Sequence, residues 1–442
     1  MKTFKRGIHP AYHKELTSGS PIEDAVLPKR VVVPLQQHAG TPCAPLVKKG
    51  DEVREGQKIG DADSFVSAPV HAPITGRVKD VAPHIHPAGA RVLSVIIEGD
   101  GASKEEWKED PSAPDAERLS AEEIRKVIRE AGIVGLGGAA FPTAVKLSPP
   151  KDRKIDTVIL NGCECEPYLT ADHRVMIEEP EKVVQGLKII MRAVGASAGC
   201  IGIEDNKTDC ADSLSRAIAK DPRIGVILLE TKYPQGAEKM LIKAVLRRNV
   251  PLGKLPLDVG VIVNNVATAV KIFEAVRYKK PLIDRVVTVS GNGVKTPKNL
   301  RVRIGTAFSD VLGQCGGLSE EGEREILAGG PMMGVAQKNL DVPVVKGTSG
   351  ITVVAGASVK PIKYEPCIRC SNCVEVCPMG LMPYRIADMG KMGMMDGFKS
   401  WSALACIECG CCSFVCPAQR PLVEWIRVGK IRLRNSEKTG SM

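Results

Sequence analysis

Aromatic residues are scarce in this 442-residue sequence, at 4% of the chain, and no basic segment alternates them with Lys and Arg. The sequence therefore gives no sign of a stacking surface for nucleic-acid bases. No apolar run approaches the roughly 18 residues that a membrane-spanning helix needs. Residues Met1–Pro10 also lack the apolar stretch of a signal peptide. These absences argue against nucleic-acid-binding, membrane-spanning and secreted proteins, and we expect a cytoplasmic protein that docks on a partner.

The chain carries a net charge of +10 and contains 15 cysteines. A single core would be unusual at this length, so three or four domains are expected. The excess of Lys and Arg suits phosphate-bearing cofactors, an anionic membrane face or an acidic partner. A high cysteine content without a secretion signal fits a reducing compartment, where disulfides are rare.

Two cysteine runs share the spacing C-x2-C-x2-C-x3-C, and a proline follows each; they are Cys367, Cys370, Cys373 and Cys377, then Cys406, Cys409, Cys412 and Cys416. This spacing is typical of two [4Fe–4S] clusters of the bacterial ferredoxin kind. In such proteins the fourth cysteine of each run ligates the other cluster. We therefore assign Cys416 to the cluster of the first run and Cys377 to the cluster of the second run.

Zinc sites and disulfides are the alternative uses of these cysteines. Zinc sites usually contain separated C-x2-C pairs rather than four cysteines within eleven residues followed by proline. Disulfides are not expected in a reducing compartment. We interpret the two runs as iron–sulfur ligands, and Cys411 as a spare packed thiol. The chain is thus expected to transfer electrons.

The N-terminal module is expected to contain small antiparallel strands, because β-branched runs such as Val31–Val33 and Val92–Ile97 alternate with Gly and Pro. Lys49–Gln57 and Ala72–Val78 resemble the two halves of a biotinyl/lipoyl barrel-sandwich domain. In that family a lysine on a hairpin tip carries the prosthetic group, and residues 59–76 contain no lysine. We therefore predict a structural or partner-binding role for this module.

A glycine-rich segment, Gly135–Lys146, follows a predicted helix that begins after Ser120, with Glu123 at the capping-box position. Gly135–Ala140 matches the spacing of a dinucleotide-binding fingerprint, but that fingerprint must follow a strand, so we reject it. A plain turn and a cradle for phosphate or flavin are both open interpretations. Glycines let backbone N–H groups approach an anion, and Lys146 adds positive charge.

Polar motifs recur at element boundaries after the glycine loop. Asn161–Tyr168 and Asn264–Thr268 each follow a short predicted strand, and Tyr233–Lys239 opens a predicted helix. Because α/β sheets bind ligands beyond the carboxyl ends of their strands, these motifs are expected to share one site. The carboxylates of the first motif suit ribose hydroxyls, a ring N–H or an amide. We interpret Cys163 and Cys165 as packing residues.

The motifs GLGGAAFPTAVK, NGCECEP, YPQGAEK and VNNVAT, in this order, resemble the FMN- and NADH-binding fold of the flavoprotein of respiratory complex I. Nearly the whole chain is similar to the RnfC family of the Rnf complex, and the two cysteine runs favour this family because the complex I flavoprotein has one cluster after this fold. The resemblance implies a flavoprotein that passes electrons from NADH through FMN to two clusters, within a membrane-bound, ion-translocating complex linked to ferredoxin.

The resemblance also implies site residues and partners. Implied FMN contacts are Gly135, Gly137, Gly138, Lys146, Asn161, Glu164, Asn264, Asn265 and Thr268, and implied nicotinamide-nucleotide contacts are Phe141 and Glu166. Cys163 stands where the complex I relative has an acid, and Lys239 and Ala267 also depart from its pattern. The implied partners are the other Rnf subunits and, indirectly, ferredoxin. The implied location is peripheral, at the cytoplasmic face of the inner membrane.

Two other functions stay open at this point. A soluble flavin and iron–sulfur reductase with another acceptor, such as cobalamin, would share the loop and the clusters, although the N-terminal module argues against it. An electron-transferring subunit that has lost its flavin would have no need of the glycine loop with Lys146 and Glu164.

The sequence therefore predicts a multidomain chain with α/β and α+β parts. A hairpin signal lies between residues 282 and 317, and the acidic, Pro-rich residues 99–118 are predicted to be a linker. The predicted segments are a barrel-sandwich module (1–105), an α/β FMN/NADH-binding domain (115–280), a soluble-ligand-binding β-grasp domain (281–355), a ferredoxin-like helical domain for two [4Fe–4S] clusters (356–430) and a basic tail (431–442).

Overall fold

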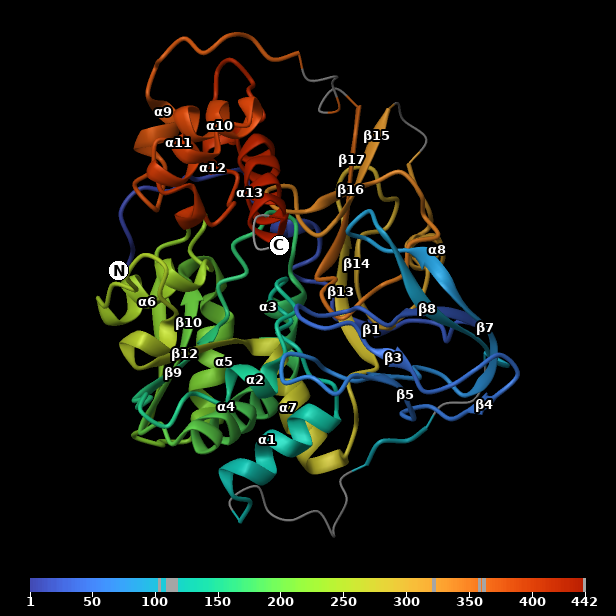
Figure 1. The fold of residues 1–442 in the computed structure, drawn as a ribbon. Helices are drawn as coiled ribbons and strands as arrows, with labels where there is room; N and C mark the ends of the chain where they lie inside the picture. The colour runs from blue at the N-terminus through green and yellow to red at the C-terminus, as the bar shows by residue number, and fades with distance from the viewer. Residues whose placement is uncertain (102–104, 109–117, 320–322, 357–358, 360–362, 440–442) are drawn as a thin grey trace.

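The computed structural model describes residues 1–101, 105–108, 118–319, 323–356, 359 and 363–439. Figure 1 shows four units, which we call the barrel-sandwich module, the parallel-sheet domain, the mixed-sheet domain and the helical domain. The helical domain lies above the parallel-sheet domain in this view, and the other two units lie together on the right. Among the described residues, no helix is both long and apolar enough to cross a membrane.

The barrel-sandwich module consists of two small sheets around one apolar core. One sheet has the order β2-β8-β7-β4 and the other the order β3-β5-β6. The strands are β2 (Arg30–Pro34), β3 (Ala44–Pro45), β4 (Glu52–Val53), β5 (Lys58–Asp61), β6 (Val70–His71), β7 (Gly76–Ile85) and β8 (Arg91–Glu98). Antiparallel pairing of β2 with β8 confirms the two predicted β-branched strands.

Part of the predicted linker contacts this module. Trp107 donates a hydrogen bond from Nε1 to Glu55 Oε1 at 2.9 Å, and its ring packs against Gly56. The predicted linker residues 102–104 and 109–117 lie outside the described part of the chain.

The parallel-sheet domain has a four-stranded sheet of order β11-β10-β9-β12, in which all the pairings are parallel. Its strands are β9 (Thr157–Asn161), β10 (Ala198–Glu204), β11 (Ile224–Leu229) and β12 (Val261–Asn265). Its helices are α1 (Ala121–Glu130), α2 (Thr143–Lys146), α3 (Ala171–Glu178), α4 (Pro180–Val194), α5 (Thr208–Ile218), α6 (Glu238–Leu246) and α7 (Val266–Tyr278), with 3-10 turns η2 (Asp205–Lys207) and η3 (Pro256–Val259). The strand order reverses between β9 and β12, and such a reversal is where open α/β sheets bind ligands.

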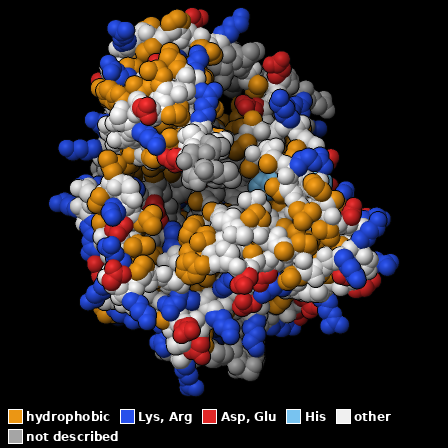
Figure 2. Space-filling model, viewed as in Figure 1, with side chains coloured by type: hydrophobic (Ala, Val, Ile, Leu, Met, Phe, Trp, Pro, Cys, Tyr) orange, Lys and Arg blue, Asp and Glu red, His pale blue; other side chains and the backbone are white. Residues whose placement is uncertain are grey.

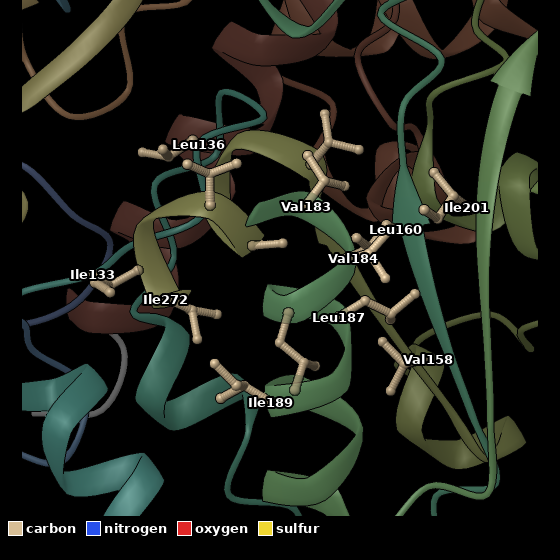
Figure 3. Close-up of a cluster of buried hydrophobic side chains, with 14 of the residues drawn as sticks. Ile133, Leu136, Val158, Leu160, Val183, Val184, Leu187, Ile189, Ile201 and Ile272 are labelled. Carbon is tan, nitrogen blue, oxygen red and sulfur yellow. The ribbon is translucent and has the colours of Figure 1, made fainter. Parts of the chain in front are cut away.

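Local signals explain where these elements begin and end. The Ser120 side chain accepts from the Glu123 N–H, and the Glu123 carboxylate accepts from the Ser120 N–H, so the predicted capping box of α1 is confirmed. Gly132, with φ +65°, ends that helix. Figure 3 shows side chains of α4, α7 and the sheet meeting in the main core, including Leu187, Ile272 and Val158.

The mixed-sheet domain contains six strands in the order β1-β14-β13-β17-β15-β16. They are β1 (Ile22–Asp24), β13 (Asp284–Ser290), β14 (Lys298–Arg303), β15 (Arg324–Ala328), β16 (Val335–Gln337) and β17 (Gly350–Ala355), and helix α8 (Phe308–Gln314) packs on them. The antiparallel pairing of β13 with β14 confirms the predicted hairpin. Strand β1 comes from the start of the chain, so the N-terminus completes this sheet.

The helical domain has short helices around the cysteine runs and one long C-terminal helix. The helices are α9 (Asn372–Glu375), α10 (Pro383–Met392), α11 (Met395–Ser400), η5 (Ala403–Ala405), α12 (Cys411–Phe414) and α13 (Leu422–Thr439). Helix α13 packs on α10 and takes in most of residues 431–442, which we expected to form a separate basic tail. Leu433 within it is buried, so this part of the helix contributes to the domain core.

The first twenty residues lie across three of these units. Lys2 and Ile8 form bridges with Leu229 and Tyr233 of the parallel-sheet domain. The Gly7 N–H donates to Val376 O of the helical domain at 3.0 Å. The 3-10 turn η1 (Lys14–Leu16) then leads into β1 of the mixed-sheet domain.

Candidate functional site

The crevice between β9 and β12 collects the polar residues that the sequence placed at strand ends. Asn161 and Asn265 lie opposite each other in the register of the two strands. Asn161 Nδ2 donates to Gly236 O at 2.8 Å, which brings the first and second polar motifs together. Asn265 Oδ1 accepts from the backbone N–H groups of Ala267 and Thr268 and caps helix α7.

Asn264 is buried, with 4% of its surface exposed, yet its Nδ2 has no hydrogen-bond partner. Buried donors are rarely left unpaired in native proteins, so this amide is available to a ligand in the crevice. Asn265 Nδ2 bonds to Asp172 Oδ2 at 2.5 Å. Burial and, to a lesser extent, the nearby Glu164 carboxylate raise the pKa of Asp172 to about 7.

The glycine loop lies directly against this crevice. The Gly135 N–H donates to Phe141 O at 2.8 Å, and the Leu136 N–H donates to Thr268 Oγ1 at 2.9 Å. Gly137 and Gly138 are exposed, and a Cβ added to Gly137 would stand 3.5 Å from Asn265. Gly138 has φ +106°, where other residues are strained. The structure thus brings the loop together with Asn265 and Thr268.

Lys146 lies at the end of α2 on the same side. Its Nζ donates to Val263 O at 2.8 Å and forms an ion pair with Glu238 Oε1 at 2.9 Å. The sequence had offered this lysine as a phosphate contact without indicating an acidic neighbour. The ion pair is partly exposed on both sides, so a bound anion would compete with Glu238 for the ammonium group.

The two carboxylates of the first polar motif have different surroundings. Glu164 accepts from the N–H groups of Asp172, at 2.7 Å, and His173, at 3.1 Å, at the start of α3. Glu166 accepts from the Met332 N–H at 3.1 Å, while its Oε1 is buried without a partner. Burial raises the pKa of Glu166 from 4.5 to about 7.

Sequence reasoning missed Lys14, which holds this motif in place from 150 residues away. Lys14 Nζ donates to Glu164 O at 2.7 Å, Glu166 O at 3.0 Å and Leu169 O at 2.6 Å. Burial lowers the pKa of Lys14 to about 8. A lysine in a short polar segment carries no signal for such a long-range contact, so only the structure reveals it.

The eight run cysteines line two pockets in the helical domain. One pocket is lined by Cys367, Cys370, Cys373 and Cys416, and the other by Cys377, Cys406, Cys409 and Cys412. Each pocket therefore gathers three cysteines of one run and the fourth of the other run. This is the sorting that two [4Fe–4S] clusters require.

The separation of these sulfurs does not suit a single zinc ion. Ligands of one zinc ion stand close together, because each Zn–S distance is about 2.3 Å. Among the described residues, the one group of three possible ligands within 4.8 Å of one another is His173, Asp209 and Cys210, and it contains none of the eight cysteines. The wider spacing leaves room for a cluster in each pocket.

The second pocket touches the parallel-sheet domain. Tyr233 is buried there, and its hydroxyl donates to Cys409 O at 2.7 Å. Tyr233, Ile8, Cys165, Cys409 and Cys411 form one apolar cluster between the two domains. The Cys165 sulfur also accepts from the Gly236 N–H at 3.3 Å, and Cys163 is buried as well.

Family models match nearly the entire chain. They are the RnfC barrel sandwich hybrid domain over residues 2–102, the Nuo51 FMN-binding domain over 128–274, the SLBB domain over 286–336 and the 4Fe-4S dicluster domain over 360–434. The predicted order of a barrel-sandwich module, an FMN-binding domain, a soluble-ligand-binding β-grasp domain and a two-cluster domain is confirmed.

Curated relatives are similar along most of their lengths. The RnfC-type subunit of the Na(+)-translocating ferredoxin:NAD(+) oxidoreductase complex of Acetobacterium woodii is 48% identical over 439 residues, covering 99% of each chain. Its counterpart in the proton-translocating complex of Clostridium ljungdahlii is 47% identical over 97% of this chain and 93% of its own. The counterpart in the ion-translocating oxidoreductase complex of Rhodobacter capsulatus is 42% identical over 99% and 84%, respectively.

Proposed function

Because this chain belongs to the RnfC family of subunits of ion-translocating ferredoxin:NAD+ oxidoreductase (Rnf) complexes, we propose that it exchanges electrons between NADH and the rest of such a complex. The observation that carries this proposal is the contact between a nucleotide-type crevice and one of two cysteine pockets, made by Tyr233 and Cys409. The chain would serve as a peripheral subunit at the cytoplasmic face of the inner membrane.

The residues of the crevice fit a bound FMN. Exposed Gly137 and Gly138 leave space and backbone N–H groups for an anion, Lys146 adds a cation, and Asn264 offers an unpaired amide donor. Bound FMN supplies the ability to exchange a hydride on one side and single electrons on the other. Asn161, Asn265 and Thr268 fix the walls of the crevice through the hydrogen bonds described above.

Glu166 and Phe141 are the proposed contacts of the nicotinamide nucleotide. The buried, unpaired Oε1 of Glu166 can accept a hydrogen bond from a ribose hydroxyl or an amide. The other oxygen stays fixed by the Met332 N–H of the mixed-sheet domain. This arrangement suits Glu166 for recognition of the nucleotide rather than for proton transfer.

The two cysteine pockets differ in their surroundings, which suggests an order along the electron route. Cys377, Cys409 and Cys412 are buried, and their pocket adjoins the parallel-sheet domain. Cys370 of the other pocket is exposed. We assign the pocket of Cys377 to the flavin end of the route and the pocket of Cys370 to the partner end.

The partner end has an apolar rim. Ile368 is 67% exposed and Phe414 is 54% exposed, and each lies next to or near a cysteine of the outer pocket. Figure 2 shows hydrophobic side chains gathered over the helical domain, at upper left. Other subunits of the complex are proposed to dock on this face, close enough for electron transfer.

The proposal is tested on the full chain purified anaerobically. We expect one FMN and eight iron atoms per chain, and co-purification with membrane subunits of the complex. Replacing Glu166 with Ala should weaken NADH binding about ten- to hundredfold, because a hydrogen bond to a charged group is worth roughly 1.5–3 kcal/mol, while FMN is retained. Purification without flavin, or as a free soluble reductase that ignores those subunits, would contradict the proposal.

A further inference from the structure

The mixed-sheet domain inserts one buried arginine into the wall of the glycine loop. Arg285, on β13, is 2% exposed. Its Nη2 donates to Leu136 O at 2.8 Å, and its Nη1 donates to Lys346 O at 2.6 Å. The guanidinium group therefore joins a carbonyl of the glycine loop to a carbonyl of its own domain.

The position of this arginine is fixed by its neighbour in β13. Asp284 forms buried ion pairs with Lys271, at 2.5 Å, and Lys280, at 2.5 Å, and Lys271 lies on helix α7. The same helix carries Thr268, which accepts from the Leu136 N–H. Strand β13 is thus attached to α7, and both hold the residue Leu136 from opposite ends of its backbone.

The geometry of a peptide unit turns these contacts into an orientation. A trans peptide is planar, so its C=O and the following N–H point in opposite directions. The Leu136 carbonyl points inward to buried Arg285. The N–H of Gly137 therefore points outward, to the exposed side of the loop, where Gly138 is also exposed.

We propose that Arg285 is a positioning residue, which holds the Leu136–Gly137 peptide so that the Gly137 N–H is presented to an anionic group of the flavin. This inference rests on the proposed function, because it takes the glycine loop as part of the FMN site. The mixed-sheet domain then has a role in cofactor binding, through a side chain outside the FMN-binding motifs. Arg285 itself does not touch the cofactor.

Charge supports the same arrangement. Burial lowers the pKa of Arg285 to about 10, although the carboxylates of Asp172 and Glu164 favour the charged form of the guanidinium group. Arg285 thus remains protonated at neutral pH and keeps its donors. Lysine would keep the charge but has no planar fork to reach both carbonyls at once.

The test compares Arg285→Lys with Arg303→Lys in the full chain, with clusters in place and flavin removed. Arg303 is the matched control, because it is a buried arginine of the same sheet that pairs with Glu55 at 2.8 Å. FMN affinity is measured by quenching of flavin fluorescence, and amide hydrogen exchange is followed in residues 133–141. We expect Arg285→Lys to raise the FMN dissociation constant at least about tenfold and to speed exchange in that segment, and Arg303→Lys to do neither.

The outcomes separate this inference from the proposed function. If the unmodified chain binds no FMN, the proposed function fails. If it binds FMN and Arg285→Lys binds equally well, or more weakly without faster exchange, the positioning role is overturned and the function stands. If Arg285→Lys does not fold, Arg285→Gln takes its place. Failure of both to fold, with Arg303→Lys intact, would assign Arg285 to stability alone and overturn the proposal.

Discussion

Glu166 illustrates at the scale of one residue how burial prepares a side chain for a ligand. One carboxylate oxygen is fixed by a backbone N–H, and the other is buried with no partner. Such an oxygen destabilises the folded chain whenever it is charged. We interpret the cost as the consequence of a nucleotide contact that is completed only when the ligand binds.

This interpretation gives a pH-dependent prediction. Burial raises the pKa of Glu166 from 4.5 to about 7. Between these values the unfolded chain ionises before the folded chain does, so the group costs stability progressively as pH rises from 4.5 to 7. Glu166→Gln removes that cost. We expect its thermal unfolding midpoint to exceed that of the unmodified chain by about 3 °C or more at pH 8, with little difference at pH 5.

Glu122→Gln, at an exposed position on α1, is the control and should show no such pH dependence. Equal unfolding midpoints for Glu166→Gln and the unmodified chain at pH 8 would show that the carboxylate carries no penalty.

At this scale the sequence predicted the identity of the polar groups better than their partners. Asn161 and Asn265 were expected at strand ends, where they indeed lie in register. Glu238, the ion-pair partner of Lys146, lies 92 residues away in another helix, and no local pattern links the two. A contact of this kind depends on how helices pack on the sheet, which composition and periodicity do not specify.

At the scale of elements, the N-terminal segment joins the motif of Glu164 and Glu166 to two other units. Lys14 is a buried cation of this segment, with three carbonyl acceptors. Lys14→Met would leave these carbonyls without a donor, and an unsatisfied buried polar group costs about 1–3 kcal/mol. We expect the thermal unfolding midpoint to fall by roughly 5 °C or more and FMN to bind more weakly.

Lys5→Met, at an exposed position of the same segment, is the matched control and should change neither property. If Lys14→Met kept the stability and FMN affinity of the unmodified chain, the N-terminal segment would be dispensable for the site.

The cysteine runs give a second prediction for elements. Cys370→Ser should remove the cluster of the outer pocket and leave the inner one, since the pockets share no cysteine. Iron per chain should therefore fall from eight to about four. Cys411→Ser is the control, because Cys411 lines the inner pocket as a ninth cysteine that we interpret as a packed thiol, and this variant should keep eight irons. Loss of all iron in Cys370→Ser would mean that the two sites do not assemble independently.

Elements with strong local signals were predicted from the sequence. The capping box of α1 and the β13–β14 hairpin are examples, because caps and turns act within a few residues. Strand β1 and turn η1 were not predicted. Each is three residues long, and β1 pairs with β14, almost 300 residues away, so its stability comes from a sheet that forms elsewhere in the chain.

At the scale of the whole molecule, buried cations join the domains around the crevice. Lys346 of the mixed-sheet domain donates to Pro69 O, at 2.6 Å, and to Gly132 O, at 2.7 Å, in two other units. Arg285 and Lys14 make comparable connections. The sequence predicted the order of the domains, but their mutual packing rests on such single side chains, whose partners are distant carbonyls that no motif records.

The central claim is that electrons of NADH reach the cysteine pockets through the crevice of the parallel-sheet domain. The most direct test is an anaerobic titration of the full chain with NADH, before and after FMN is removed and then restored. The account predicts that NADH bleaches the broad cluster absorption only when FMN is present, whereas dithionite bleaches it in every sample. Equal bleaching by NADH without FMN, or none with FMN restored, would contradict the account.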